Sequence, residues 1–250
     1  MAQGVPRETA DYRNSNTSAR FLGCLTSALA KSFAIAPLVM LLQFLPFDVG
    51  AADVSLGTGP VIVAAFGTSL THNGGWLTPL QEELSHCLGR QVTVLDFGKD
   101  GQTSEGALRS VGQVIEAHPD VVLIEFSAND AAWFKGFSLK RSRENTARIV
   151  QKILRALPET KVFLMTMGPA WGPRSWIRLN LDAYYSLYES LAHELGVGYI
   201  DNRPAWKALG ENGLRSAIPD GTHPLPELAS RLLVPTISKA IVPDCTSGGS

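Results

Sequence analysis

Three residues of this chain have the types and spacing needed for nucleophilic acyl chemistry. Ser69 comes three residues after the end of a strongly apolar run at 61–66, whereas Asp220 and His223 lie three residues apart in the last part of the sequence. A serine hydroxyl becomes a good nucleophile when a neighbouring imidazole takes its proton. A carboxylate that accepts the other imidazole N–H orients the ring and stabilises its charged form. We therefore predict that Ser69, His223 and Asp220 form a catalytic triad.

An oxyanion that develops on the substrate needs hydrogen-bond donors already in place. The backbone N–H groups of Ser69 and Gly101 and the side-chain amide of Asn129 are predicted to supply them. His72 is a rival base, because it lies three residues after Ser69. It has no adjacent carboxylate in the sequence, so a role at the rim of the site is favoured for it.

The spacing of apolar residues predicts the elements that carry these groups. Five strand-like runs alternate with amphipathic helical segments, of which one begins after Ser138 and another stops at Gly196. This alternation predicts a parallel sheet with helices on both faces. Ligands bind at the carboxyl ends of the strands in such sheets, where Ser69, Gly101 and Asn129 are expected. The strands are expected at 61–66, 91–97, 121–126, 161–167 and 197–200, and a closing helix at 225–241.

Each of these short motifs alone is also typical of an ordinary turn or helix cap. In this order, Ser69, Gly101, Asn129 and the Asp220/His223 pair together resemble the four blocks of the SGNH (GDSL-type) hydrolase superfamily. The resemblance extends from about residue 61 to residue 241. It implies a flavodoxin-like, three-layer α/β/α sandwich around a five-stranded parallel sheet, and an esterase, lipase or acylhydrolase activity. Two departures, Thr68 for the usual Asp and Ser127 for the usual Gly, remove no group that the chemistry requires.

The resemblance and the residues around the site predict a serine esterase that works through an acyl-enzyme. Four tryptophans are expected in loops at the strand ends, where they could stack on sugar rings, so short acyl groups on carbohydrate are the expected substrates. An O-acyltransferase acting on polysaccharide and a non-catalytic glycan-binding protein on the same scaffold remain alternatives. The candidate substrate-binding residues are Trp76, Trp133, Trp171 and Trp176.

The first 52 residues differ from the rest of the chain. A basic polar region precedes an apolar run at 33–47 and then small residues, which is the order of an export signal. We expect a signal or an uncleaved anchor at 1–52, the hydrolase domain at 58–243 and a flexible tail at 244–250. A periplasmic or secreted location follows, with no stable membrane domain once the signal is removed.

The composition also limits the classes of partner and cofactor that are expected. The net charge is −1, so no global field attracts nucleic acid. Neither a metal-ligand spacing nor a nucleotide-binding loop is present, and no cofactor or metal is predicted. Two questions stay open: whether Cys87 and Cys245 pair in an oxidising compartment, and what accompanies Glu125, a carboxylate placed within a buried strand.

Overall fold

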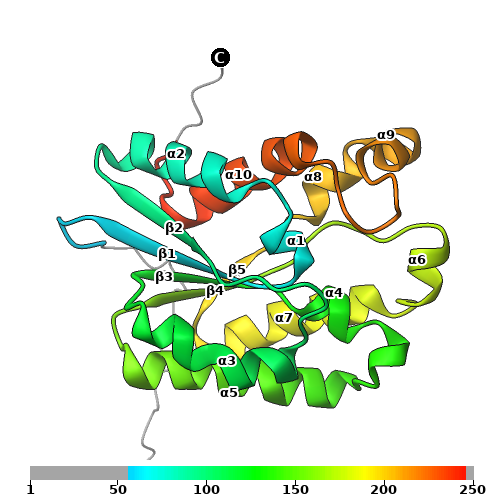
Figure 1. Ribbon diagram of the computed structural model, residues 1–250, viewed down its shortest axis with the longest axis horizontal. Helices are drawn as coiled ribbons and strands as arrows, with labels where there is room; N and C mark the ends of the chain where they lie inside the picture. Colours follow the sequence, from blue (N-terminus) through cyan, green and yellow to red (C-terminus); the bar gives the residue numbers. More distant parts are fainter. Residues whose placement is uncertain (1–55, 246–250) are drawn as a thin grey trace, which may run out of the picture. The chain divides into compact units, whose positions relative to one another are not determined.

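The computed structural model describes residues 56–245, which form one five-stranded parallel sheet (Figure 1). The strand order is β2-β1-β3-β4-β5, with every neighbouring pair parallel. The first strand has the predicted bounds and the other four are shorter than predicted, whereas the fold class is confirmed. The strands are β1 (Val61–Phe66), β2 (Val92–Asp96), β3 (Val121–Ile124), β4 (Lys161–Met165) and β5 (Gly198–Ile200).

Helices cover both faces of the sheet because successive strand residues point to opposite sides and most of them are apolar. Val63 and Ala65 of β1 pack into the core under α2 (Leu77–Leu88) and α10 (Pro226–Ile241). Ala64 and Phe66 pack on the other side, where Figure 1 shows three long helices. These are α3 (Ser104–Glu116), α5 (Leu139–Ala156) and α7 (Leu181–Leu195).

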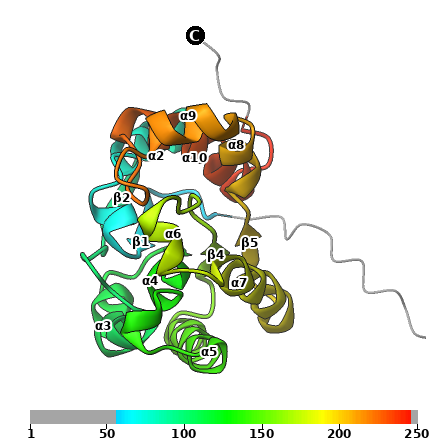
Figure 2. The same ribbon diagram turned by 90° about the vertical axis from the view of Figure 1, so that its right-hand side faces the viewer.

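Short helices follow the carboxyl ends of the strands and build the loops there. Figure 2 looks onto this edge, where α4 and α6 lie between the two helical layers. None of these short helices was predicted, since three to eight residues are too few to show a helical repeat. They are α1 (Ser69–His72), α4 (Ser127–Asp130), η1 (Trp133–Lys135), α6 (Pro173–Trp176), α8 (Arg203–Lys207) and α9 (Gly210–Ala217).

Two predicted helix ends are confirmed. The Ser138 hydroxyl accepts a hydrogen bond from the Arg141 N–H at 3.2 Å and caps α5. Gly196 ends α7 in the left-handed conformation with φ at 65°, which a glycine adopts without steric cost. Within residues 56–245, no helix is both long and apolar enough to cross a membrane. The predicted signal at 1–52 and all but the first two residues of the predicted tail lie outside the described residues.

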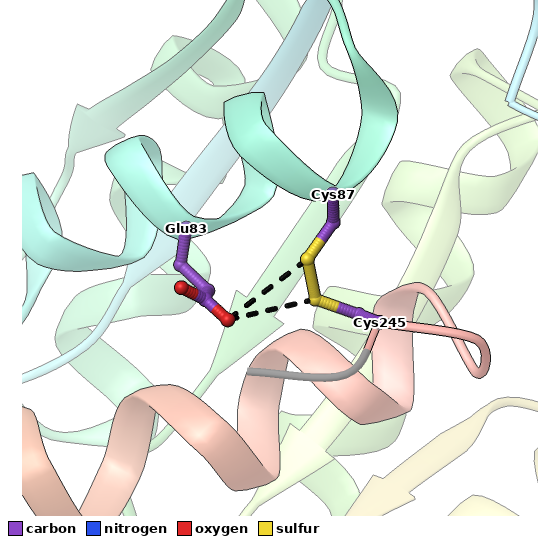
Figure 3. A group of neighbouring side chains, drawn as sticks. All are labelled: Glu83, Cys87 and Cys245. Carbon is purple, nitrogen blue, oxygen red and sulfur yellow. Dashed lines mark hydrogen bonds between the residues drawn. A yellow bond between two sulfur atoms is a disulfide. The ribbon is translucent and has the colours of Figure 1, made fainter. Parts of the chain in front are cut away.

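A disulfide joins Cys87, near the end of α2, to Cys245, beyond α10 (Figure 3). The two Cα atoms are 5.3 Å apart, within the usual range for a bridged pair. Glu83 places Oε1 3.9 Å from Cys87 Sγ and 3.8 Å from Cys245 Sγ. These three residues have the proximity of a metal-binding group, but paired sulfurs offer no thiolate to an ion.

Candidate active site

Ser69 begins α1 immediately after β1. The Thr68 side chain caps this short helix by accepting the Leu70 N–H at 3.1 Å. Ser69 Oγ lies 2.9 Å from His223 Nε2, which is a hydrogen-bond distance between residues 154 positions apart in the chain. The fold therefore brings the predicted nucleophile and the predicted base into direct contact.

Asp220 completes this line of contacts. Its Oδ2 lies 2.7 Å from His223 Nδ1, and its Oδ1 accepts the backbone N–H groups of Thr222 at 2.8 Å and His223 at 2.6 Å. Burial opposes ionisation of Asp220, but these hydrogen bonds outweigh it and lower its pKa to about 2. Asp220 is therefore a carboxylate at neutral pH, as an orienting group for an imidazole must be.

Ser69 and His223 open into a cavity of about 320 Å³. Its other lining residues are Asn73, Asp100 and Gly101. The Asn73 amide donates to Asp100 Oδ1 at 2.8 Å, so α1 is tied to the loop that carries Gly101. Gly101 has φ at 66°, a left-handed conformation that suits glycine. Asn73 and Asp100 were not predicted as site residues.

Asn129 lies in α4, after β3, and contacts the segment next to the cavity residue Gly101. Its side-chain Nδ2 donates to the backbone oxygen of Gln102 at 2.9 Å, beside Gly101. The next residue, Asp130, accepts the Ser104 N–H at 2.9 Å and the Ser142 hydroxyl at 2.6 Å. α4 is thus fixed to the loop after β2. Asn129 is not among the residues that line the cavity, and its second amide hydrogen is available for another acceptor.

Glu125 has the partners that the sequence could not name. Its fully buried carboxylate accepts the Thr68 N–H at 2.5 Å, the Thr68 hydroxyl at 2.9 Å and the Thr71 hydroxyl at 2.8 Å. A side chain at Gly67 would overlap this carboxylate, which explains the glycine. Burial raises the pKa of Glu125 to about 7, although the three hydrogen bonds oppose the shift. Glu125 therefore holds Thr68 and Thr71, which lie on either side of Ser69, in place.

His72 has a carboxylate partner after all, because its Nδ1 lies 2.7 Å from Oδ2 of Asp96, the last residue of β2. The hydrogen bond to Asp96 and its charge raise the pKa of His72. Its side chain is half exposed, in keeping with the rim position expected for it. Sequence proximity did not reveal Asp96, whereas its place at a strand end could have done so.

The four tryptophans lie in different environments, and the prediction for Trp76 is wrong. Trp76 is completely buried, and its indole N–H donates to the Leu70 carbonyl at 2.9 Å. Trp171 is half-buried, bonded to the Ile218 carbonyl at 2.8 Å and covered by Arg215. Trp133 and Trp176 are 70% and 68% exposed. Only the last two present most of the indole to solvent.

Residues 62–229 match the GDSL-like lipase/acylhydrolase family over most of the described chain. The chain belongs to this family. It is accordingly a carboxylic-ester hydrolase, and the resemblance predicted from the sequence is confirmed. No match was found among curated proteins.

Several solved structures are similar to this chain. A lipase/acylhydrolase from Enterococcus faecalis is 25% identical, with a TM-score of 0.58 over 71% of this chain and 95% of its own. A putative acylhydrolase from Bacteroides fragilis is 23% identical, with a TM-score of 0.58 over 74% of this chain and 88% of its own. A mutant of an acetylxylan esterase from Geobacillus stearothermophilus is 18% identical, with a TM-score of 0.65 over 78% of this chain and 99% of its own. The last two are less than 25% identical to this chain, and their similarity is one of fold.

Proposed function

We propose that this GDSL-like hydrolase removes short acyl groups from carbohydrate through a Ser69–His223–Asp220 triad. The contact of Ser69 Oγ with His223 Nε2 at 2.9 Å, continued to Asp220 at 2.7 Å, is the observation that supports the triad most directly. In this assignment Nδ1 of His223 carries the proton that faces Asp220. Nε2 is then free to take the Ser69 proton.

The reaction proceeds in two halves. Ser69 Oγ attacks the ester carbonyl carbon while His223 accepts its proton, and the negative charge moves to the carbonyl oxygen. The N–H groups of Ser69 and Gly101 and the amide of Asn129 are proposed to stabilise this oxyanion. The bond between the carbonyl carbon and the sugar oxygen then breaks, His223 gives its proton to that oxygen, and the sugar leaves with a free hydroxyl while the acyl group stays on Ser69. Water, deprotonated by His223, then releases the free acid and restores Ser69.

The composition of the cavity supports a short acyl group. Its lining consists of Ser69, Asn73, Asp100, Gly101 and His223, none of which is a large apolar residue. A long acyl chain needs an extensive apolar surface to leave water, at about 0.8 kcal/mol per methylene group. A lining without large apolar side chains therefore favours a substrate such as an acetyl ester over a long-chain ester.

Two exposed tryptophans support the carbohydrate part of the proposal. Lys135 Nζ of η1 donates to the Gly101 carbonyl at 3.4 Å, which ties the turn that carries Trp133 to the loop of Gly101. The backbone N–H of Trp133 donates to the Ile177 carbonyl at 3.0 Å. This bond brings α6, which carries Trp176, next to η1. Exposed indoles beside a polar site suit stacking on sugar rings. The acetylxylan esterase described above acts on such a substrate, as its name states.

Hydrolysis of p-nitrophenyl esters from acetate to palmitate, with wild type and Ser69→Ala, tests the triad and the acyl length. We expect acetate to be the best substrate and the variant to lose activity. Acetate release from acetylated oligosaccharides then tests the carbohydrate. Preference for long chains with no release from glycans would reject the short-acyl proposal. Acylated sugar in place of free acid would identify an O-acyltransferase, and no labelling by a fluorophosphonate would indicate a binding protein.

We also propose that the protein is exported. The basic, apolar and small-residue order of residues 1–52 supports this, and the Cys87–Cys245 disulfide is of a kind that persists in oxidising compartments. Cell fractionation followed by N-terminal sequencing tests the proposal. We expect a periplasmic or secreted protein that begins near residue 52. A cytoplasmic protein with an intact N-terminus would contradict it, and membrane retention would indicate an uncleaved anchor.

A further inference from the structure

A second cavity, of about 280 Å³, lies among α6, α7 and α8 and shares no lining residue with the cavity at Ser69. Three cationic side chains line it, those of Arg178, Arg203 and Lys207. Asp182 is the one carboxylate among the lining residues. The esterase chemistry proposed above makes no use of this cavity.

Arg178 is the cation that most needs a partner, because its side chain belongs to a residue only 6% exposed. Its Nε donates to the Ala128 carbonyl at 2.8 Å, and its Nη1 donates to the Arg174 carbonyl at 3.3 Å. A guanidinium has five N–H donors, so three are left without a protein acceptor in the part of the chain that the structure describes. No carboxylate of residues 56–245 lies within 4.0 Å of it.

A buried charge with no carboxylate in contact is costly, and the environment of Arg178 shows this. Burial and then the nearby Arg174 lower its pKa, and Tyr185 and the more distant carboxylate of Asp220 oppose this shift only in part. An anion in the cavity would remove the cost, which a neutral ligand could not do. Arg178 lies on the wall of the cavity, so an anion bound there can contact its guanidinium.

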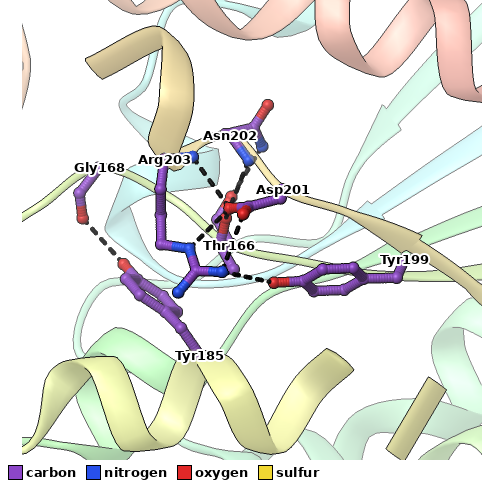
Figure 4. Close-up of polar contacts among 7 residues, drawn as sticks. All are labelled: Thr166, Gly168, Tyr185, Tyr199, Asp201, Asn202 and Arg203. Carbon is purple, nitrogen blue, oxygen red and sulfur yellow. Dashed lines mark hydrogen bonds and ion pairs between the residues drawn. The ribbon is translucent and has the colours of Figure 1, made fainter. Parts of the chain in front are cut away.

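Arg203 differs from Arg178, because its charge is already matched (Figure 4). It forms a two-fold ion pair with Asp201, at 2.7 Å from Nε and 2.8 Å from Nη2, and Nη2 also donates to the Tyr199 hydroxyl at 3.2 Å. Its guanidinium lies 5.9 Å from the centre of the Tyr185 ring. The guanidinium of Arg203 is therefore held in place by its partners, whereas Arg178 and the exposed Lys207 have N–H donors that a ligand can use.

The charges and the walls together define the ligand. Three cations and one carboxylate, that of Asp182, line the cavity, and Asp201 pairs with Arg203, so the lining carries more positive than negative charge. Leu179, which is 81% exposed, and Leu181 supply apolar surface for a carbon frame. We propose that this cavity binds a small organic anion with a single carboxylate, which Arg178 and Lys207 hold while the carbon frame packs on Leu179.

A uronic acid of a glycan and a free short-chain acid share this chemistry. Calorimetric titration of the wild-type protein with glucuronate, butyrate, glucose and inorganic phosphate separates them without any turnover. We expect saturable binding of glucuronate, butyrate or both, and none of glucose. Binding of glucuronate alone would indicate a sugar-acid ligand, whereas binding of both would include free acids.

Variants locate the site. We expect Arg178→Gln to weaken carboxylate binding by about tenfold or more, as for loss of a charged hydrogen-bond donor. Lys207→Gln changes an exposed residue, so the fold is retained, and it should weaken binding about two- to fivefold. Lys152→Gln, an exposed lysine on α5 outside both cavities, is the matched control and should change nothing.

Three results would overturn the proposal. They are the absence of carboxylate binding, tighter binding of phosphate than of either carboxylate, and binding that survives in both Arg178→Gln and Lys207→Gln. Because Lys207 is outside the proposed catalytic cavity, the effect of Lys207→Gln also separates this site from product binding beside Ser69.

Discussion

Asn129 is the single residue whose proposed role can be tested most directly by kinetics. One of its amide hydrogens is used in the bond to the Gln102 carbonyl, and the other is proposed to meet the oxyanion. Removal of one such donor costs about 3–4 kcal/mol of transition-state stabilisation. We expect Asn129→Ala to lower kcat by about 100- to 1000-fold with little change in KM. Asn212→Ala, on the exposed side of α9, is the control, and an unchanged kcat would remove Asn129 from the site.

Glu125 makes the stability of the protein depend on pH. Its pKa is about 7 in the folded protein and close to the model-peptide value of 4.5 when unfolded, so the folded state binds more protons between these values. This contribution to stability is fully present below pH ~4.5 and is lost as the pH rises through ~7. The loss is on the order of 3 kcal/mol for a fully buried group with this shift.

The matched variant is Glu125→Gln, which keeps the shape of the side chain and cannot ionise. Urea unfolding of both proteins at several pH values between 5 and 8 measures the difference. We expect the free energy of unfolding of wild type to fall relative to the variant as the pH rises. His72, whose pKa is also raised, titrates in both proteins and cancels from the comparison. Parallel pH profiles would show that Glu125 does not ionise in this range.

At the scale of elements, the loop from Asp220 to His223 depends on a backbone conformation that only glycine adopts easily. Gly221 has φ at 81°, and a Cβ there would lie 2.5 Å from the Trp171 carbonyl oxygen. We expect Gly221→Ala to displace Asp220 and His223 and to lower kcat by at least about tenfold, because small misplacements at a reacting centre are costly.

Gly136→Ala is the matched control for this loop. Gly136 has nearly the same φ, 72°, but a Cβ there meets nothing within 4 Å. It therefore measures the backbone strain alone, which is about 1 kcal/mol of stability. Equal activity of the two variants would mean that the contact with Trp171 does not position the triad residues.

The repeated alternation of apolar and amphipathic segments was enough to predict five parallel strands and their helices. β3 nevertheless ends at Ile124 rather than 126, because the Phe126 N–H donates at 3.0 Å to the Tyr188 hydroxyl of α7. Such a bond depends on a residue 62 positions away, and no local pattern contains it. Long-range contacts of this kind also decide which polar residue accompanies Glu125 or His72.

Trp76 shows why the substrate-binding surface was harder to predict than the triad residues. Trp76 was expected in a loop, and two glycines do precede it, but they do not leave its indole exposed. A Cβ at Gly74 would lie 2.6 Å from the Trp76 ring, so the missing side chain lets the backbone close over the indole. Order along the chain identifies groups that meet at strand ends, whereas exposure depends on packing in three dimensions.

At the scale of the whole molecule, the disulfide joins α2 to the segment that follows α10, away from Ser69. Cys87 is near the end of α2 that leads into β2, where the Val92 N–H donates to the Ser85 hydroxyl at 3.2 Å. α2 runs back from the site to the amino ends of the strands. The bridge is therefore expected to affect stability and to leave the proposed catalytic residues in place.

The disulfide closes a chain segment with a sequence separation of 158, so it removes much of the conformational freedom of the unfolded state. Disulfides of this kind typically contribute about 2–4 kcal/mol. We expect the Cys87→Ala/Cys245→Ala double variant to have a free energy of unfolding lower by about this amount, measured by urea unfolding. Its kcat for p-nitrophenyl acetate should be unchanged. Wild type treated with a reductant should behave as the double variant does, whereas the double variant should not respond to the reductant. Identical unfolding of wild type with and without reductant would show that the two sulfurs do not form a stabilising bond in solution.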